Sequence, residues 1–93
     1  MKYNLGITGH TGVLGSEFIK YNSSKKFIKF KGNITKKKDV REWISKKNIN
    51  FLFHFAAVVP TKIVSNNYSY ANKVNFIGTK ILVDECLKSK KIK

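Results

Sequence analysis

Disulfide bonds and cysteine-based metal sites are excluded by how little cysteine the sequence contains. Cys86 is the only cysteine among 93 residues, so no bridge can form within the chain. This cysteine usage is typical of a reducing compartment, and we expect a cytoplasmic protein. Proline is equally scarce, because Pro60 stands alone. With no Ser/Gly-rich linker either, residues 1–93 are expected to belong to one domain.

Long hydrophobic runs are absent as well. No apolar stretch approaches the roughly 20 residues that a membrane-spanning helix needs. The N-terminus leads directly into a strand-like segment rather than a signal peptide. Hydrophobic residues still make up 42% of the chain, which excludes disorder of the whole sequence. We therefore expect a folded protein with no membrane partner.

Acidic residues are few. The chain has 5 Asp and Glu against 19 Lys and Arg, a formal net charge of +14. Such a charge suits either a polyanion partner, such as nucleic acid, or an ordinary lysine-coated surface. Arg41 is the single arginine, whereas base and phosphate recognition tends to use arginine forks. The lysines are also scattered, apart from 36–38 and 88–93. We favour the lysine-coated surface and predict no nucleic-acid partner.

Strand-like and helix-like segments alternate along the chain. Strands are expected at 3–8, 27–30 and 51–57, and helices at about 12–21, 35–48 and 67–88. This β-α-β-α-β-α order predicts a parallel sheet with right-handed crossovers and helices on its faces. The continuous apolar run at 51–57 predicts a strand buried on both faces.

Each helix has an expected apolar face or cap. The first helix would carry Leu14, Phe18 and Tyr21 on one face. Thr35 is the expected N-cap of the second helix. The face of that helix would be formed by Val40, Trp43, Ile44 and Lys47. The apolar stripe of the third helix would be formed by Val74, Ile77, Gly78, Ile81, Leu82 and Cys86.

Three glycines stand where the first strand passes into the first helix. Gly9 can take a tight turn that other residues resist. Gly12 lets the backbone approach a pyrophosphate, and Gly15 lets the helix pack close to the strand. The free N–H groups at the helix start favour a phosphate. We prefer this dinucleotide site to the alternative, a plain turn between strand and helix.

The glycine spacing is G-x-x-G-x-x-G, and residues 8–15 resemble the T-G-x-x-G-x-x-G signature of the extended short-chain dehydrogenase/reductase superfamily. Residues 54–57 are similar to its H-x-A-A, residues 74–82 to its V-N-x-x-G-T-x-x-L, and residues 32–35 to its G-D-[IVL]-T. These matches come in the family's order and cover nearly the whole chain. The resemblance is to the NAD-dependent epimerases and dehydratases that modify sugar nucleotides. It implies an α/β, Rossmann-type parallel sheet with flanking helices. The sheet would be incomplete, with about three strands and three helices, and residues 1–93 would be the N-terminal portion of the domain, without its substrate domain.

The resemblance also implies a set of cofactor-binding residues. The glycine turn would line the pyrophosphate, and Asn33 and Ile34 would lie against the adenine. Asn33 stands where the family normally has Asp, and its amide oxygen can still accept from an amino group. Small residues after the third strand would leave room for the ribose and nicotinamide, and Asn75 would support the strand–helix junction nearby. The full set is Gly9, Thr11, Gly12, Val13, Leu14, Gly15, Asn33, Ile34, Ala56, Ala57, Val58 and Asn75.

Two further residues have competing interpretations. His54 has the chemistry of a metal ligand or general base. No second His, Asp or Glu lies near it in the sequence, and the resemblance implies a structural histidine that faces neighbouring backbone. Trp43 lies on the apolar face of its helix, which favours a core residue over a stacking platform. We predict no metal site and no catalytic residue in this chain.

The segment that selects the cofactor departs from the family. One strand fits between the first helix and Gly32, where the family usually has two. No carboxylate lies between Glu17 and Asp39 to accept a ribose 2′-hydroxyl. Lys29 or Lys31 could instead face a 2′-phosphate. The expected cofactor is therefore NAD or NADP, with a slight preference for NADP.

The family's chemistry uses a Tyr, a Lys four residues later and a Ser or Thr, which together exchange protons while the nicotinamide exchanges a hydride. These residues would follow residue 93. One Y-x-x-x-K spans Tyr21–Lys25, but at the end of the first helix we interpret it as a coincidence. We expect the NAD(P)-binding portion of a sugar-nucleotide epimerase, dehydratase or reductase, inactive by itself. The alternative is a non-catalytic dinucleotide-binding or interaction module on the same fold.

The third strand has a physical consequence for the isolated chain. It would be interior in the family's full sheet, but here it would become an edge with unpaired backbone groups. We expect the 93-residue chain to be marginally stable or to self-associate, and a homodimer is possible.

Overall fold

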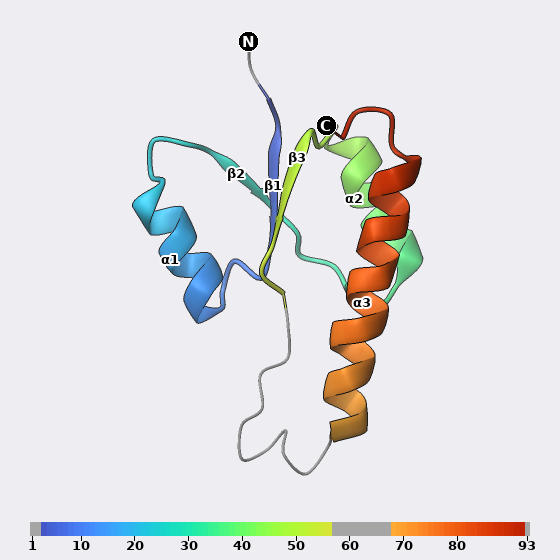
Figure 1. The fold of residues 1–93 in the computed structure, drawn as a ribbon. Coiled ribbons are helices and arrows are strands. Elements are labelled where there is room, and N and C mark those ends of the chain that lie inside the picture. Colours follow the sequence, from blue (N-terminus) through green and yellow to red (C-terminus); the bar gives the residue numbers. More distant parts are fainter. Residues whose placement is uncertain (1–2, 57–67, 93) are drawn as a thin grey trace.

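The computed structural model describes residues 3–56 and 68–92, and these residues form a parallel sheet between helices (Figure 1). The strands are β1 (Leu5–Thr8), β2 (Phe27–Lys29) and β3 (Phe51–His54). The helices are α1 (Val13–Tyr21), α2 (Lys37–Lys46) and α3 (Tyr68–Lys88). The strand order is β2-β1-β3, with Leu5 opposite both Phe27 and Phe51. This arrangement confirms the predicted Rossmann-type sheet of three strands and three helices.

The helices cover the two faces of the sheet unequally. Figure 1 shows α1 on one side and both α2 and α3 on the other. The core lies between the sheet and the α2–α3 layer, and its buried members are Phe30, Val40, Trp43, Ile44, Ile49 and Leu82. Gly6 of β1 admits the Trp43 indole, since a Cβ on Gly6 would lie 2.8 Å from it. Trp43 is therefore a core residue, as predicted.

The other face of the sheet is covered by α1 alone among the described helices (Figure 1). Phe18 packs its ring against Phe27, Phe53 and Phe55, with centroid distances of 5.5, 4.9 and 5.1 Å. The prediction that Leu14 and Tyr21 share this face was wrong, because they are 73% and 83% exposed. Gly15 packs against the backbone of the turn at Gly9, and that contact turns the Gly15 side of α1 toward the sheet. Leu14, one residue away around the helix, consequently faces solvent.

Two smaller expectations also need correction. The N-cap of α2 is Lys36 rather than Thr35, whose hydroxyl instead donates to Asn33 Oδ1 at 2.6 Å. The β3 side chains are half-buried rather than buried on both faces. The reason is that β3 lies at one edge of the sheet formed by the described residues.

The third helix packs through its predicted stripe. Gly78 and Leu82 are buried, and Ile77, Ile81 and Cys86 are half-buried. The Val74 side chain lies outside the described residues. A Cβ on Gly78 would lie 2.9 Å from Ile34, so the missing side chain allows close packing. None of the helices, within 3–56 and 68–92, combines the length and apolar character needed to cross a membrane.

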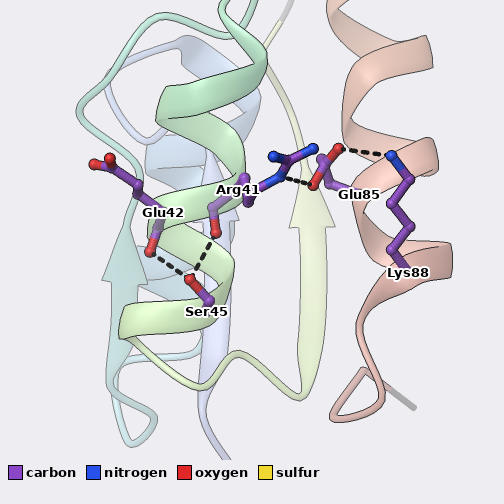
Figure 2. A network of polar contacts seen from close by, with 5 residues as sticks. All are labelled: Arg41, Glu42, Ser45, Glu85 and Lys88. Carbon is purple, nitrogen blue, oxygen red and sulfur yellow. Dashed lines mark hydrogen bonds and ion pairs between the residues drawn. The ribbon is translucent and has the colours of Figure 1, made fainter.

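A buried carboxylate joins α2 to α3 (Figure 2). Arg41 Nε donates to Glu85 Oε1 at 3.0 Å, and Lys88 Nζ lies 3.6 Å from Glu85 Oε2. Glu85 is only 4% exposed, and a charge so buried needs a partner. The hydrogen bond from Arg41 lowers the pKa of Glu85, so the carboxylate stays ionised.

Candidate functional site

The turn between β1 and α1 requires glycine at two positions. Gly9 has φ +75°, and a Cβ there would lie 2.5 Å from both Ala56 N and Phe55 C. A Cβ on Gly15 would lie 2.0 Å from the oxygen of Gly9. The Gly12 N–H donates to that same oxygen at 3.2 Å. The turn is therefore folded tightly against the end of β3. The predicted tight turn at Gly9 and close packing at Gly15 are confirmed.

The start of α1 is open to a ligand. Its N-cap, Gly12, contributes no side-chain hydrogen bond, and the first turn carries no acidic residue. Val13 and Leu14 are exposed beside it, at 79% and 73%. An uncapped helix start presents N–H groups and the positive end of the helix dipole, which together favour an anion.

A cavity of about 810 Å³ lies beside this turn. It is lined by Gly9, His10, Thr11, Phe30, Lys31, Gly32, Asn33, Ile34, Thr35, Asp39 and Ala56. Five of the predicted cofactor residues meet in it, namely Gly9, Thr11, Asn33, Ile34 and Ala56. The segments after β1, β2 and β3 thus converge at the carboxyl edge of the sheet, where α/β folds bind ligands.

The other predicted residues lie elsewhere. Gly12, Val13 and Leu14 form the exposed start of α1, and Gly15 is buried beneath it. Asn75 lines a separate depression on α3 with Phe76, Thr79, Lys80, Val83 and Asp84. Ala57 and Val58 lie outside the described residues.

Asn33 is held in place by its neighbours. Its Oδ1 accepts from the Thr35 N–H at 2.9 Å and from the Thr35 hydroxyl at 2.6 Å, which uses both lone pairs. The Asn33 N–H donates to Asp39 Oδ2 at 2.9 Å. The amide oxygen that was expected to accept from adenine is therefore occupied, and the Nδ2 group is the part of this side chain left to face a ligand.

Sequence reasoning missed the carboxylate in this cavity. Asp39 lies in the first turn of α2, six residues after Asn33, and its carboxylate reaches back to the Asn33 backbone. The signal was the placement of an acidic residue in a helix first turn soon after a G-N-I-T segment. Lys31 also lines the cavity, whereas Lys29 does not.

His54 lies between two threonine side chains rather than against backbone. Its Nδ1 is 2.6 Å from Thr8 Oγ1, and its Nε2 is 3.1 Å from Thr79 Oγ1. Burial lowers the pKa of His54, which favours the neutral imidazole. Across 3–56 and 68–92, no three His, Cys, Asp or Glu side chains gather as a metal site would require.

The geometry agrees with comparisons to known proteins. The model of the NAD dependent epimerase/dehydratase family matches residues 5–93. A comparison with curated proteins found no match.

Solved structures with this fold include two enzymes described as UDP-glucose 4-epimerases in complex with NAD. The structure from Thermus thermophilus is 16% identical with a TM-score of 0.79, over 91% of this chain and 34% of that one. The structure from Brucella ovis is 19% identical with a TM-score of 0.77, over 97% and 34%. An L-threonine dehydrogenase from Phytophthora infestans is 15% identical with a TM-score of 0.78, over 96% and 34%. The chain thus spans about a third of the length of these structures, and identities this low establish the fold alone.

Proposed function

The chain belongs to the NAD dependent epimerase/dehydratase family, and we propose that it forms the dinucleotide-binding portion of an oxidoreductase-type enzyme of that family. The observation that carries this proposal is the turn at Gly9, which has no room for a side chain where it packs against the end of β3. An uncapped helix start and a large cavity both lie beside this turn. A dinucleotide needs both features, one for its pyrophosphate and one for its adenosine.

The proposed pyrophosphate contacts come from the start of α1. The backbone of residues 9–15 would supply N–H donors, and the helix dipole would add a favourable field. Gly12 leaves the approach clear, since a Cβ there would find only the Gly9 oxygen, at 3.5 Å. Val13 and Leu14 are exposed, and their backbone N–H groups would complete this anion site.

The proposed adenosine contacts come from the cavity. Ile34 offers an apolar surface to the adenine, and Asn33 Nδ2 offers donors to its ring nitrogens. Ala56 would form the floor, and the proposal extends this role to Ala57 and Val58, which follow it in the sequence. Asn75 is proposed to support the nearby strand–helix junction.

The cavity contains side chains of both charge signs. Lys31 would attract the 2′-phosphate of NADP, and Asp39 would repel it. The slight preference for NADP gains no support from the family, which is NAD dependent, nor from neighbours bound to NAD. We propose NAD as the cofactor, and expect Lys31→Met to weaken NADP binding more than NAD binding.

The whole protein is proposed to act on a nucleotide sugar. Two of the neighbours are described as UDP-glucose 4-epimerases, and these support a nucleotide-sugar substrate. On this proposal, residues 1–93 are the N-terminal portion of the binding domain, and hydride transfer depends on residues outside them. Tyr21 takes no part, because it is 83% exposed at the end of α1 and is absent from the cavity lining.

Calorimetric titration with NAD⁺, NADP⁺ and ADP tests the proposal. We expect all three to bind, with NAD⁺ at least as tight as NADP⁺, because they share the adenosine and pyrophosphate groups that the site would hold. Duplex DNA is the control for the net charge of +14. Binding of DNA without binding of any adenine nucleotide would overturn the proposal in favour of a polyanion site.

A further inference from the structure

Thr8, His54 and Thr79 form a chain of side chains that connects β1, β3 and α3. Thr8 Oγ1 lies 2.6 Å from His54 Nδ1, and His54 Nε2 lies 3.1 Å from Thr79 Oγ1. Thr8 is fully buried and directly precedes Gly9. The chain therefore begins at the residue that introduces the glycine turn.

The hydrogen bonds around Thr8 indicate which nitrogen of the His54 ring carries the proton. A threonine hydroxyl has one proton to donate and two lone pairs. The Ala56 N–H is directed at Thr8 Oγ1 at 3.2 Å, and the Phe55 N–H is shared between that oxygen at 3.2 Å and the Thr8 main-chain oxygen at 3.0 Å. With its acceptor side filled, Thr8 Oγ1 donates its proton to His54 Nδ1. His54 Nε2 then carries the ring proton and donates to Thr79.

The same backbone segment forms the wall behind the glycine turn. A Cβ on Gly9 would lie 2.5 Å from Ala56 N and from Phe55 C, so the turn rests directly on that peptide. Ala56 also lines the cavity. The Thr8 hydroxyl thus sets where Ala56 lies relative to Gly9, and it does so only while its proton has an acceptor on His54.

We propose that His54 is a positioning residue for dinucleotide binding. Its neutral ring accepts the Thr8 proton and so keeps the Thr8 hydroxyl bonded to the Phe55 and Ala56 amides, an arrangement we call the Thr8 clamp. Protonation of the ring releases this clamp. A proton on Nδ1 would make that atom a third donor to Thr8 Oγ1 and leave the hydroxyl proton without an acceptor in a fully buried position. One of the Phe55 and Ala56 amides would then lose its partner. The inference rests on the proposed function for its ligand.

Among the described residues, few charged groups near His54 compete with this effect. β1 contributes uncharged Thr8, and α3 contributes Thr79. The half-buried Cys86 of α3 lines the same groove as His54. The neighbouring Lys80 and Asp84 pair with each other at 3.1 Å. Burial lowers the pKa of His54, so the clamp is closed at neutral pH and opens as the pH falls below the ordinary histidine value of 6.5.

The first test is the pH profile of NAD⁺ affinity between about pH 8 and pH 5. NAD⁺ is the probe because it lacks the monoester phosphate of NADP⁺, which titrates near pH 6. We expect wild-type affinity to fall in the acidic part of this range, by up to about tenfold per pH unit below the pKa of the folded state. A flat wild-type profile would overturn the proposal.

Variants separate positioning from a merely structural role. His54→Asn keeps an oxygen near the position of Nδ1 but cannot titrate, so we expect it to retain more affinity at pH 8 than His54→Leu and to lose the acidic fall. His10→Asn is the control, because His10 also lines the cavity. This variant should keep the acidic fall, because His10 is not a member of the Thr8–His54–Thr79 chain. Persistence of the fall in His54→Asn would refute the proposal.

A measurement without ligand keeps this inference distinct from the proposed function. In the ¹⁵N-labelled wild-type chain, we expect the Nε2–H tautomer of His54 at neutral pH. The Phe55 and Ala56 amide resonances should shift together as His54 titrates. If NAD⁺ fails to bind but these shifts occur, the proposed function fails and the clamp stands. A dominant Nδ1–H tautomer would refute the Thr8 clamp, whether or not NAD⁺ binds. So would Phe55 and Ala56 amide resonances that stay unchanged while His54 titrates.

Discussion

The main-chain oxygen of Gly9 occupies the space that a side chain at residue 15 would need. A Cβ on Gly15 would lie 2.0 Å from that oxygen. The oxygen belongs to the backbone, so it cannot rotate out of the way as the end of a flexible side chain could. This contact fixes the direction in which α1 leaves the turn. It also determines which side of α1 meets the sheet, and hence why Leu14 faces solvent at 73% exposure.

Gly15→Ala should therefore destabilise the fold, because the turn and α1 must move apart to admit the methyl group. We expect a loss of about 1–3 kcal/mol in the free energy of unfolding, the usual range for overpacking. Urea unfolding followed by circular dichroism measures it. Gly12→Ala is the matched control, since its Cβ would meet only the Gly9 oxygen at an ordinary 3.5 Å. Equal stability of the two variants would contradict this account.

Gly12→Ala should instead affect binding. Its methyl group would stand between the backbone and the proposed pyrophosphate, so we expect NAD⁺ affinity to fall at least about tenfold, or about 1.4 kcal/mol, with the fold retained. Titration calorimetry measures the affinity. Tyr21→Ala, a change at an exposed residue outside the cavity, should leave it unchanged. An unaltered dissociation constant in Gly12→Ala would count against a pyrophosphate at this position.

The buried Glu85 should make stability depend on acid. Its pKa is lowered in the folded chain, first by the hydrogen bond from Arg41. The ion pair therefore contributes stability that is present above the pKa of the unfolded chain, about 4.3, and is lost as the pH falls through the lower folded value. Wild type should lose more stability than Glu85→Gln between about pH 6 and pH 3 in urea titrations. Glu42→Gln is the control, because Glu42 is 47% exposed in its pair with Lys46 and should behave like wild type.

Cys86 should react slowly while the chain is folded. Burial, and secondly the charge of Glu85, raises the pKa of its thiol, so little thiolate is present at neutral pH. We expect iodoacetamide to modify Cys86 more slowly than it modifies free cysteine, and urea to remove the difference. Mass spectrometry follows the reaction. Equal rates in folded and unfolded chains would show that the thiol is unprotected.

The β3 edge should drive association of the isolated chain. Lys29 lies in β2 and lysines at 25, 26 and 31 flank it, whereas residues 48–61 around β3 contain no charged residue. Lysine is one of the means by which proteins protect sheet edges. The groove beside β3 is apolar and includes Val83 and Leu87, which are 50% and 80% exposed. We expect analytical ultracentrifugation to show concentration-dependent association.

Leu87→Lys should reduce that association by placing a charge beside the edge. Tyr21→Lys is its control, because it adds the same charge at an exposed residue on α1. If both variants weaken association equally, net charge rather than the β3 groove controls it. A wild-type chain that stays monomeric and unfolds in one highly stable transition would refute the expectation altogether.

Local patterns were enough to predict the sequence of elements and the position of the turn. Hydrophobic spacing identified three strands and three helices, and placed Trp43 in the core, because these features depend on residues a few positions apart. The glycines at 9, 12 and 15 were identifiable for the same reason, since their spacing lies within one short segment. Of the three, backbone contacts exclude a side chain at Gly9 and Gly15 but not at Gly12. The parallel sheet followed from the alternation of elements.

Contacts between distant segments had to come from the tertiary structure. The Thr8 hydroxyl finds its acceptor on His54, 46 positions away, and Arg41 pairs with Glu85 across 44 positions. No local pattern specifies such pairs, because their geometry depends on how helices and strands pack. The sequence by itself thus determined which elements form and where the glycine turn lies. Only packing decided which side chains line the cavity and which histidine nitrogen carries the proton.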